Sequence, residues 1–385
     1  MRVLLVTRNL PPLVGGMERL NWHMAKELNR FAQVLVVGPK GSADRAPEGV
    51  FVEEVPLRPI PIFLLRAFWL ALRRARSWRP HWILAGSGLT APIVRLVSRS
   101  VGARAGMYAH GLDLALQHPV YRLLWFPAIR RMDVLMANSS STRTYAIRAG
   151  VPHAQIEILH PGVDIPSKLP DAQSVARFRK EFQLGDRRVL LSVGRLTERK
   201  GMREFVADVL PRIAEVHPDI LLMVIGDTAT HALHAHSQTR QSIEEAAAAH
   251  GVAANLRFLG VITDREKLSV AYASADLHVF PVRERSGDPE GFGMVAIEAA
   301  AHGLATVAYA TGGVVDAVHE GHSGVLVAPG DSVAFSEAVL CLLRTPMPVD
   351  AIREHAEPFC WEHFGASLRR ILLSMNRSVR DRDNV

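Results

Sequence analysis

The stretch DPEGFGMVAIEAAAHGLATVAYATGGVVDAV, residues 288–318, decides the fold. In it, Gly291, Phe292 and Gly293 precede an alanine-rich run of helical length, and Gly303 follows that run. The apolar segment Thr306–Tyr309 then predicts a buried strand, and a second glycine pair comes after it. A glycine loop, a helix and a buried strand in this order are typical of a doubly wound α/β sheet, which binds ligands where its strands end.

The same alternation of apolar runs and helical patterns extends along the whole chain. Continuous rather than alternating apolarity predicts strands of a parallel sheet that is buried on both faces. A helix is predicted at Met17–Phe31, and a second apolar stripe with helical spacing runs from Met202 to Ile213. The predicted strands are Val3–Val6, Val34–Val37, Trp82–Ala85, Ala105–Tyr108, Val134–Ala137, Val189–Val193, Leu221–Ile225, Leu277–Phe280, Thr306–Tyr309 and Val325–Val327. The sequence therefore predicts doubly wound α/β layers.

The chain is long enough for two such domains. Its 385 residues exceed one typical domain, and each half is large enough to bury its own core. Residues 166–188 carry several charges and no clear apolar strand, so we predict a linker there. It would join an N-terminal domain at 1–165 to a C-terminal domain at 189–360, with a cleft between them. A helix at about 361–378 is expected to pack back on the N-terminal domain.

Composition and charge exclude several classes of protein. A content of 48% hydrophobic and 22% charged residues indicates a folded protein, without an apolar stretch of about 18 residues that would span a membrane. Two cysteines cannot build a disulfide framework, so a cytoplasmic setting is expected. The net charge of +7 favours an anionic partner such as nucleotide phosphates. No basic run interleaved with aromatics is present, so nucleic acid is not expected as a partner.

Two carboxylates flank the start of the predicted helix in the deciding stretch. Glu290 precedes the helix and Glu298 lies about two turns into it, which separates them by roughly a dozen ångströms along the axis. They are too far apart to share one metal and suit hydroxyl groups at two ends of an extended ligand, such as a sugar and a ribose. A capping and a solvated glutamate on an ordinary helix would have the same spacing, but the flanking glycines favour the ligand interpretation.

Cations follow another predicted strand, in the motif SVGRLTERKG at residues 192–201. Arg195 and Lys200 flank a short loop where this strand ends, and two fixed cations there can neutralise a leaving diphosphate without a metal. Arg199 is expected to point into solvent. A solvated turn is the alternative, and the position after a strand favours phosphate binding.

Together these motifs resemble the GT4-type retaining glycosyltransferases, which have the GT-B fold of two Rossmann-like domains facing a cleft. The resemblance covers nearly the whole chain and rests on GRLTERKG followed, about ninety residues later, by EGFG and Glu298. Further landmarks are Gly15 and Gly16 before the first helix, YAHG at 108–111, HPGVD at 160–164, FLG at 258–260, Asp276 and Trp361.

The resemblance implies an enzyme that moves a mannose- or glucose-type hexose from a UDP- or GDP-sugar to a glycan, a lipid-linked glycan or a lipid. It implies retention at the anomeric carbon, with no cofactor and no metal. Arg195 and Lys200 would hold the donor diphosphate, and Glu298 the ribose. Glu290 and His110 would contact the transferred sugar as the catalytic residues. The remaining donor-binding residues would be Gly15, Gly16, Gly291, Phe292, Gly293 and Met294.

Two alternatives stay open, a GT-B nucleotide-sugar epimerase and a catalytically silent GT-B binding subunit. The combination of GRL…KG with EGFG…E argues against the epimerase, and the intact charged donor residues argue against the silent subunit. The tripeptide 226–228 is Gly-Asp-Thr where the family more commonly has Gly-Asp-Gly, which leaves the base of the nucleotide open. The tract that follows contains His231, His234 and His236, for which a polar surface loop is preferred over a zinc site.

A basic amphipathic segment, Ile62–Ser77, raises the question of a membrane. It combines aromatic residues and leucines with Arg66, Arg73, Arg74 and Arg76. Packing of its apolar face on the sheet is the default, with the arginines exposed. Such a helix can also lie on an anionic bilayer, so peripheral contact with the inner face of the membrane is the second hypothesis.

Overall fold

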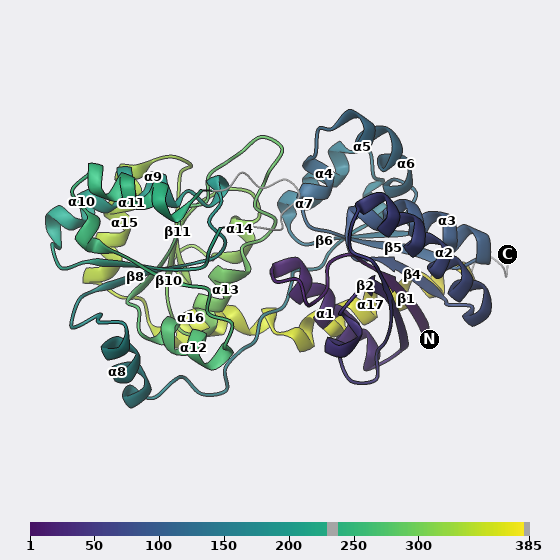
Figure 1. Cartoon of the computed structure of the whole chain (residues 1–385), viewed down its shortest axis with the longest axis horizontal. Coiled ribbons are helices and arrows are strands. Elements are labelled where there is room, and N and C mark those ends of the chain that lie inside the picture. Colours follow the sequence, from purple (N-terminus) through teal and green to yellow (C-terminus); the bar gives the residue numbers. More distant parts are fainter. Residues whose placement is uncertain (229–237, 381–385) are drawn as a thin grey trace. The chain divides into compact units, whose positions relative to one another are not determined.

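The computed structural model describes residues 1–228 and 238–380, the last five of these in their backbone only, and divides the chain into two compact units. Unit 1 comprises Met1–Gly162 together with Phe359–Val385, and unit 2 comprises Val163–Pro358. In each unit a parallel sheet is covered by helices, as Figure 1 shows. The predicted architecture of two doubly wound α/β domains is therefore confirmed.

Unit 1 is built on a seven-stranded parallel sheet in the order β3-β2-β1-β4-β5-β6-β7. Its strands are β1 (Arg2–Val6), β2 (Gln33–Pro39), β3 (Phe51–Val55), β4 (Trp82–Ala85), β5 (Arg104–Ala109), β6 (Val134–Ala137) and β7 (Ile156–Ile158). Its helices are α1 (Gly16–Asn29), α2 (Ile60–Trp78), α3 (Ala91–Val101), α4 (Leu112–Ala115), α5 (Pro119–Leu124), α6 (Phe126–Ile129), α7 (Ser140–Arg148) and α17 (Trp361–Arg380). The central strands β4 and β6 are buried along their whole length, as expected of a sheet covered on both faces.

The last helix, α17, belongs to unit 1 and packs beside α1. The ring of Trp361 stacks on that of His23, with centroids 3.8 Å apart and an interplanar angle of 3°. A Cβ placed on Gly365 would lie 2.5 Å from Oε2 of Glu27, so only glycine allows this approach of the two helices without adjustment. The predicted return of a C-terminal helix to the first domain is thus confirmed.

Unit 2 is built on a six-stranded parallel sheet in the order β10-β9-β8-β11-β12-β13. Its strands are β8 (Val189–Val193), β9 (Leu221–Ile225), β10 (Leu256–Gly260), β11 (Leu277–Phe280), β12 (Thr306–Tyr309) and β13 (Gly324–Val327). Its helices are α8 (Ala172–Glu181), α9 (Met202–Asp208), α10 (Leu210–Val216), α11 (Arg240–Ala249), α12 (Arg265–Ala273), α13 (Met294–Ala301), α14 (Val314–Ala317), α15 (Ser332–Arg344) and α16 (Val349–Ala356).

Two segments differ from the sequence predictions. The stripe from Met202 to Ile213 is two helices, α9 and α10, rather than one, because Pro211 has no N–H to continue the hydrogen-bond ladder. The predicted linker 166–188 contains α8, whose Phe178 lies with Leu184 in the core of unit 2. No clear sequence signal marks α8, because most of its residues are polar or charged and Phe178 is its one buried position.

Candidate functional site

The candidate site lies in unit 2, where three neighbouring strands end. Strands β8, β11 and β12 are adjacent and parallel, so the loops that follow them meet at one edge of the sheet. These loops span residues 194–201, 281–293 and 310–313. They contain all the donor-binding residues predicted in this half except Met294 and Glu298, which lie on α13. Ligands of doubly wound sheets bind at this kind of edge.

The Glu290 carboxylate lies at the centre of an ion-pair cluster. Its Oε2 is 2.9 Å from Nζ of Lys200 and 3.0 Å from Nη1 of Arg199, and its side chain is 10% exposed. Glu290 and Lys200, which were predicted separately as donor-binding residues, are thus in direct contact. Within the described part of the chain Oε1 has no partner, so this oxygen is available to accept a hydrogen bond from a ligand hydroxyl.

Arg199 points inward, which corrects the expectation that it faces solvent. Its side chain is 15% exposed, Nη1 donates to the carbonyl oxygen of Pro289 at 2.9 Å, and Nε lies 3.5 Å from Oδ1 of Asp288. The reason is the short 3-10 turn η4 (Glu198–Lys200), which Gly201 ends in the left-handed conformation. From this turn Arg199 and Lys200 both reach the loop before α13.

Positive charge exceeds negative charge in the cluster. Burial by itself would raise the pKa of Glu290, but Arg199, Lys200 and the more distant Arg195 lower this pKa to about 2. Burial lowers the pKa of Lys200, an effect that Glu290 partly offsets. Arg195 is exposed, and among the described residues its guanidinium makes no hydrogen bond or ion pair. Three cations therefore face the carboxylates of Glu290 and Asp288, and the excess charge suits an anion such as a diphosphate.

The glycine pair after β12 packs directly on the backbone that carries Glu290. The N–H of Gly313 donates to the carbonyl oxygen of Glu290 at 2.9 Å. A Cβ on Gly313 would lie 2.1 Å from the carbonyl oxygen of Gly291, and one on Gly312 would lie 2.5 Å from that of Glu290. The two glycine motifs of the deciding stretch are thus one packed unit, in which side chains at 312 and 313 would displace the Glu290 backbone.

Glu298 lies on α13 and is buried, with 8% of its surface exposed. The phenol of Tyr272 on α12 donates to its Oε2 at 3.1 Å. The ring of His302 stacks on Tyr272 and bonds to the carbonyl oxygen of Glu298 at 2.7 Å and to Oγ of Ser269 at 2.9 Å. Tyr272 was not predicted from the sequence, since a tyrosine on an amphipathic helix gives no signal of its partner.

The helix that follows the glycine loop, α13, offers an open N-terminus. Gly293 precedes it with φ of 93°, which favours glycine, and its Cβ would lie 2.9 Å from Cε1 of Phe280. The first turn, which starts at Met294, contains no acidic residue, and no side chain caps it. Phe292, just before it, is buried with 2% exposed. Free backbone N–H groups and the helix dipole make such an end suitable for an anion.

The glycines predicted in unit 1 lie at the N-terminus of α1, where the situation differs. A Cβ on Gly15 would lie 2.5 Å from Oε2 of Glu18, and Gly16 is exposed. Glu18 is buried and accepts from Nδ2 of Asn9 through its Oε1 at 2.8 Å. This N-terminus therefore already has a carboxylate beside it, in contrast to that of α13.

His110 follows β5 and is fixed by two backbone contacts. The ring nitrogen Nε2 lies 2.9 Å from the carbonyl oxygen of Gly86. The backbone N–H of His110 donates to Oδ2 of Asp113 at 3.0 Å. Because a carbonyl oxygen only accepts, Nε2 must carry the proton. In the neutral ring Nδ1 is then the acceptor.

The amphipathic segment forms α2, visible in unit 1 of Figure 1. Phe63, Ala67, Ala71 and Ala75 are buried in the core of unit 1, which confirms the default packing. We define the α2 stripe as its exposed residues Ile62, Leu65, Arg66, Trp69, Arg73 and Arg76. Arg74 departs from the prediction of exposed arginines, because it pairs with Glu53 on the edge strand β3. No helix among the described residues is both long and apolar enough to cross a bilayer.

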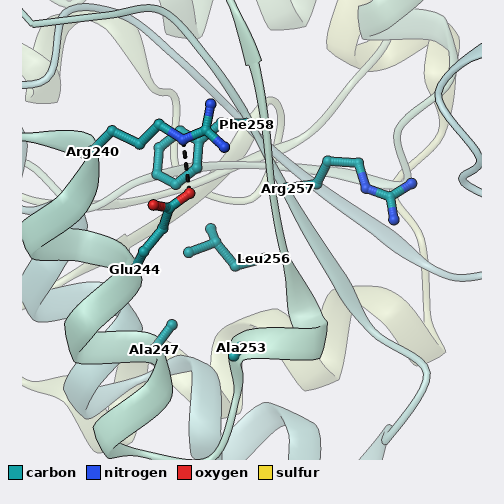
Figure 2. Close-up of a pocket in the computed structure, with 7 residues that line it drawn as sticks. All are labelled: Arg240, Glu244, Ala247, Ala253, Leu256, Arg257 and Phe258. Carbon is teal, nitrogen blue, oxygen red and sulfur yellow. Dashed lines mark hydrogen bonds and ion pairs between the residues drawn. The ribbon is translucent and has the colours of Figure 1, made fainter.

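Two further features bear on other ligands. Over residues 1–228 and 238–380 no group of three or more His, Cys, Asp or Glu side chains is arranged to hold a metal, and His231, His234 and His236 lie outside the described residues. A cavity of about 250 Å³ lies between α11 and β10, and Figure 2 shows the residues that line it. Nε of Arg240 pairs with Oε1 of Glu244 at 2.7 Å, and Cζ of Arg240 lies 5.1 Å from the centre of the Phe258 ring. Phe258 of the FLG landmark lines this cavity, but none of the predicted catalytic or donor-binding residues does.

Comparison with known families gives matches over both units. Residues 14–166 match the model described as Glycosyltransferase Family 4, and residues 174–357 match the model described as Glycosyl transferases group 1.

Named relatives and solved structures match over nearly the full length. The GDP-mannose-dependent alpha-(1-6)-phosphatidylinositol monomannoside mannosyltransferase of Mycolicibacterium smegmatis is 31% identical, over 98% of this chain and 100% of the relative. A glycogen synthase of Mycobacterium tuberculosis is 28% identical, over 99% of this chain and 96% of its own. The crystal structure of Anabaena HepE in complex with UDP has a TM-score of 0.79 at 19% identity, covering 97% of this chain and 100% of that one. At this identity, the last similarity shows the fold alone.

Proposed function

Because the chain belongs to glycosyltransferase family 4, we propose that it transfers a hexose from a GDP- or UDP-sugar to a glycan, a lipid-linked glycan or a lipid. We further propose retention at the anomeric carbon and catalysis without a metal ion. Hexosyl transfer from a nucleotide sugar itself follows from the family and from the named relatives. The nucleotide, the acceptor, the stereochemistry and the independence from metal form the proposal.

The cation cluster at the end of β8 carries this proposal. Lys200 and Arg199 meet at one oxygen of Glu290, and Arg195 is exposed beside them without a partner in the described chain. A departing nucleoside diphosphate develops negative charge, which the cations at this edge of the sheet and the N-terminus of α13 stabilise. This arrangement supplies the charge that a divalent metal supplies in other transferases.

Each predicted side chain has a distinct role in the proposal. Oε1 of Glu290 accepts a hydrogen bond from a hydroxyl of the transferred hexose. The backbone N–H groups of Gly291, Phe292, Gly293 and Met294 bind the sugar and the phosphates of the donor. Glu298, oriented by Tyr272, binds the ribose hydroxyls. For unit 1 we propose that Nδ1 of His110 accepts from a sugar hydroxyl and that Gly15 and Gly16 are further donor-binding positions.

The names of the relatives favour a first choice of donor and acceptor. The Mycolicibacterium smegmatis relative is named for GDP-mannose and a phosphatidylinositol mannoside, and it matches this chain over its full length. The α2 stripe fits an acceptor of this class, because apolar side chains flanked by arginines can rest on an anionic lipid surface. We therefore propose GDP-mannose with a lipid-linked acceptor as the first pair to test, and peripheral membrane contact through α2.

A thermal-shift screen with GDP-mannose, UDP-glucose and ADP-glucose tests the donor, because a ligand that binds the folded state raises the melting temperature. The donor selected is then incubated with phosphatidylinositol mannosides, and the anomeric configuration of the product is read by NMR. Glu290→Gln should abolish transfer while leaving the fold intact by circular dichroism. No shift with any nucleotide sugar, or full activity of the variant, would overturn the proposal.

The same experiment separates the rival epimerase. An epimerase would convert the donor in the absence of any acceptor, so NMR of donor and enzyme alone should reveal the epimer of the donor sugar, either free or bound to the nucleotide. A transferase should leave the donor unchanged apart from slow hydrolysis.

A further inference from the structure

The two cations that pair with Glu290 are held by different numbers of contacts. Lys200 reaches Oε2 of Glu290 at the end of a flexible four-carbon stem, with Nζ 4.5 Å from the centre of the Phe280 ring. Arg199 reaches the same oxygen but is also bonded to the carbonyl oxygen of Pro289 and paired with Asp288. Arg199 therefore contacts three successive residues of one loop, whereas among the described residues the ammonium of Lys200 pairs with the Glu290 carboxylate and otherwise lies over the Phe280 ring.

The backbone of Arg199 is tied to the same loop. Its carbonyl oxygen accepts from the N–H of Arg283 at 2.8 Å. The neighbouring Gly201 lies so close that a Cβ there would be 2.2 Å from the carbonyl oxygen of Pro281. Main chain and side chain of Arg199 thus hold the loop 281–290 at both of its ends, so this cation cannot turn away without dismantling the loop.

We propose that Arg199 is a positioning residue which keeps Glu290 ionised and oriented while Lys200 moves from Glu290 to the donor diphosphate. This inference rests on the proposed function. A diphosphate carries more charge than one carboxylate, so it competes for the three donors of Nζ. Without Arg199, the departure of Lys200 would leave the buried carboxylate with only the more distant Arg195 as counter-charge, and burial would then favour the neutral acid.

The proposal separates Arg199 from the residues that touch the ligand. Arg199 acts on the sugar through Glu290, so its loss should weaken binding of a nucleotide sugar far more than binding of the nucleoside diphosphate. The loss of a residue that held the diphosphate directly would weaken the binding of both ligands equally. The effect should also vanish once Glu290 itself is removed.

The test measures dissociation constants by calorimetry for GDP-mannose and GDP, with UDP-glucose and UDP in parallel, between pH 4.5 and 8. The dissociation constant of each variant is divided by that of wild type at the same pH, which cancels the titration of the ligand itself. For Arg199→Gln we expect about a tenfold loss for the nucleotide sugar at pH 8 and less than about threefold for the diphosphate. The loss should grow toward pH 4.5, because the pKa of Glu290 should rise without this cation and its carboxylate is lost as pH falls through that pKa.

Three further variants complete the experiment. Arg199→Lys keeps the charge but not the fork, so it should weaken sugar binding without adding a pH dependence. In a Glu290→Gln background, Arg199→Gln should change affinity by less than about twofold. Arg203→Gln is the matched control, since Arg203 is exposed and, among the described residues, its guanidinium pairs only with the adjacent Glu204.

The outcomes distinguish this inference from the proposed function. If wild type binds none of the nucleotide sugars, the proposed function is wrong. If wild type binds a nucleotide sugar but Arg199→Gln weakens the binding of both ligands equally, the inference is wrong and the proposed function stands. The same holds if the affinity of Arg199→Gln depends on pH as that of wild type does. Should Arg199→Gln fail to fold, the ligand ratio of Arg199→Lys decides the matter: a larger loss of affinity for the nucleotide sugar than for the diphosphate supports the inference, and an equal loss for both overturns it.

Discussion

Replacement of Gly313 by Ala should damage the donor site through the backbone alone. The new Cβ would lie 2.1 Å from the carbonyl oxygen of Gly291, 2.6 Å from its carbonyl carbon and 2.8 Å from Cα of Phe292. All three are backbone atoms, so no side chain can turn aside. Ordinary contact begins at 3.4 Å, and the two loops must therefore separate by about 1.3 Å.

This separation sets the magnitudes. Overpacking of this kind costs about 1–3 kcal/mol, which should lower the melting temperature by roughly 2–12 °C for a unit of this size. A shift of about 1 Å in the residue that orients a substrate can cost about a hundredfold in rate. We therefore expect a loss of that order in kcat/KM at a temperature where the variant is folded, and a weakened affinity for the nucleotide sugar.

Gly324→Ala provides the matched control. Its Cβ would lie 1.9 Å from the carbonyl oxygen of Thr306, a comparable clash between the neighbouring strands β12 and β13. It should lower the melting temperature similarly while leaving donor affinity unchanged. Equal donor affinity in Gly313→Ala and Gly324→Ala would refute the argument that the glycine pair positions Glu290.

Four other predictions follow from the same contacts. Glu290→Gln should lose about 3 kcal/mol of folding stability at pH 7, because ionisation of Glu290 at a pKa of about 2 rather than the usual 4.5 stabilises the folded state. In acid denaturation the difference in stability between wild type and variant should shrink as pH falls from 4.5 to 2. A difference in stability that persists at about pH 2 would contradict this prediction. Tyr272→Phe removes the phenol donor of Glu298, so affinity for GDP should fall about tenfold in calorimetry, unless Glu298 has no role in binding the ribose. Changing the three arginines of the α2 stripe to Gln should abolish flotation with anionic vesicles at low salt, whereas Arg212→Gln on α10 should not. Dialysis against EDTA should leave the transfer rate within about twofold, and a loss restored by Mg²⁺ or Mn²⁺ would show that a metal takes part.

The strands that could be predicted from the sequence are those whose apolarity is continuous. All ten predicted strands are present, and the three missed strands, β3, β7 and β10, lie at sheet edges. β3 contains Glu53 and Glu54, and β10 contains Arg257. A strand with only one neighbour can direct polar side chains to solvent, so it lacks the continuous apolar run by which a central strand is recognised.

Within the site, the motifs predicted which loops meet but not how each side chain is used. Glu290 and Lys200 were expected as donor residues, and the order of the strands brings them together. The role of Arg199 could not be read from the run Glu-Arg-Lys, because a 3-10 turn decides which of the three side chains faces inward. Its position immediately before Lys200 was the only available signal. Tyr272 comes from a helix that no motif connected to Glu298.

The membership of α17 in unit 1 determines the order in which the protein can be completed during synthesis. Unit 2 is one continuous segment, so the ribosome finishes it before Trp361 and the rest of α17 emerge. Until then the ring of His23 lacks its stacking partner, and α1 lacks the helix that packs beside it. A nascent chain halted before residue 359 therefore carries a complete second unit and an unfinished first one. The part made first is the last to be protected, and aggregation or proteolysis of stalled chains should begin there.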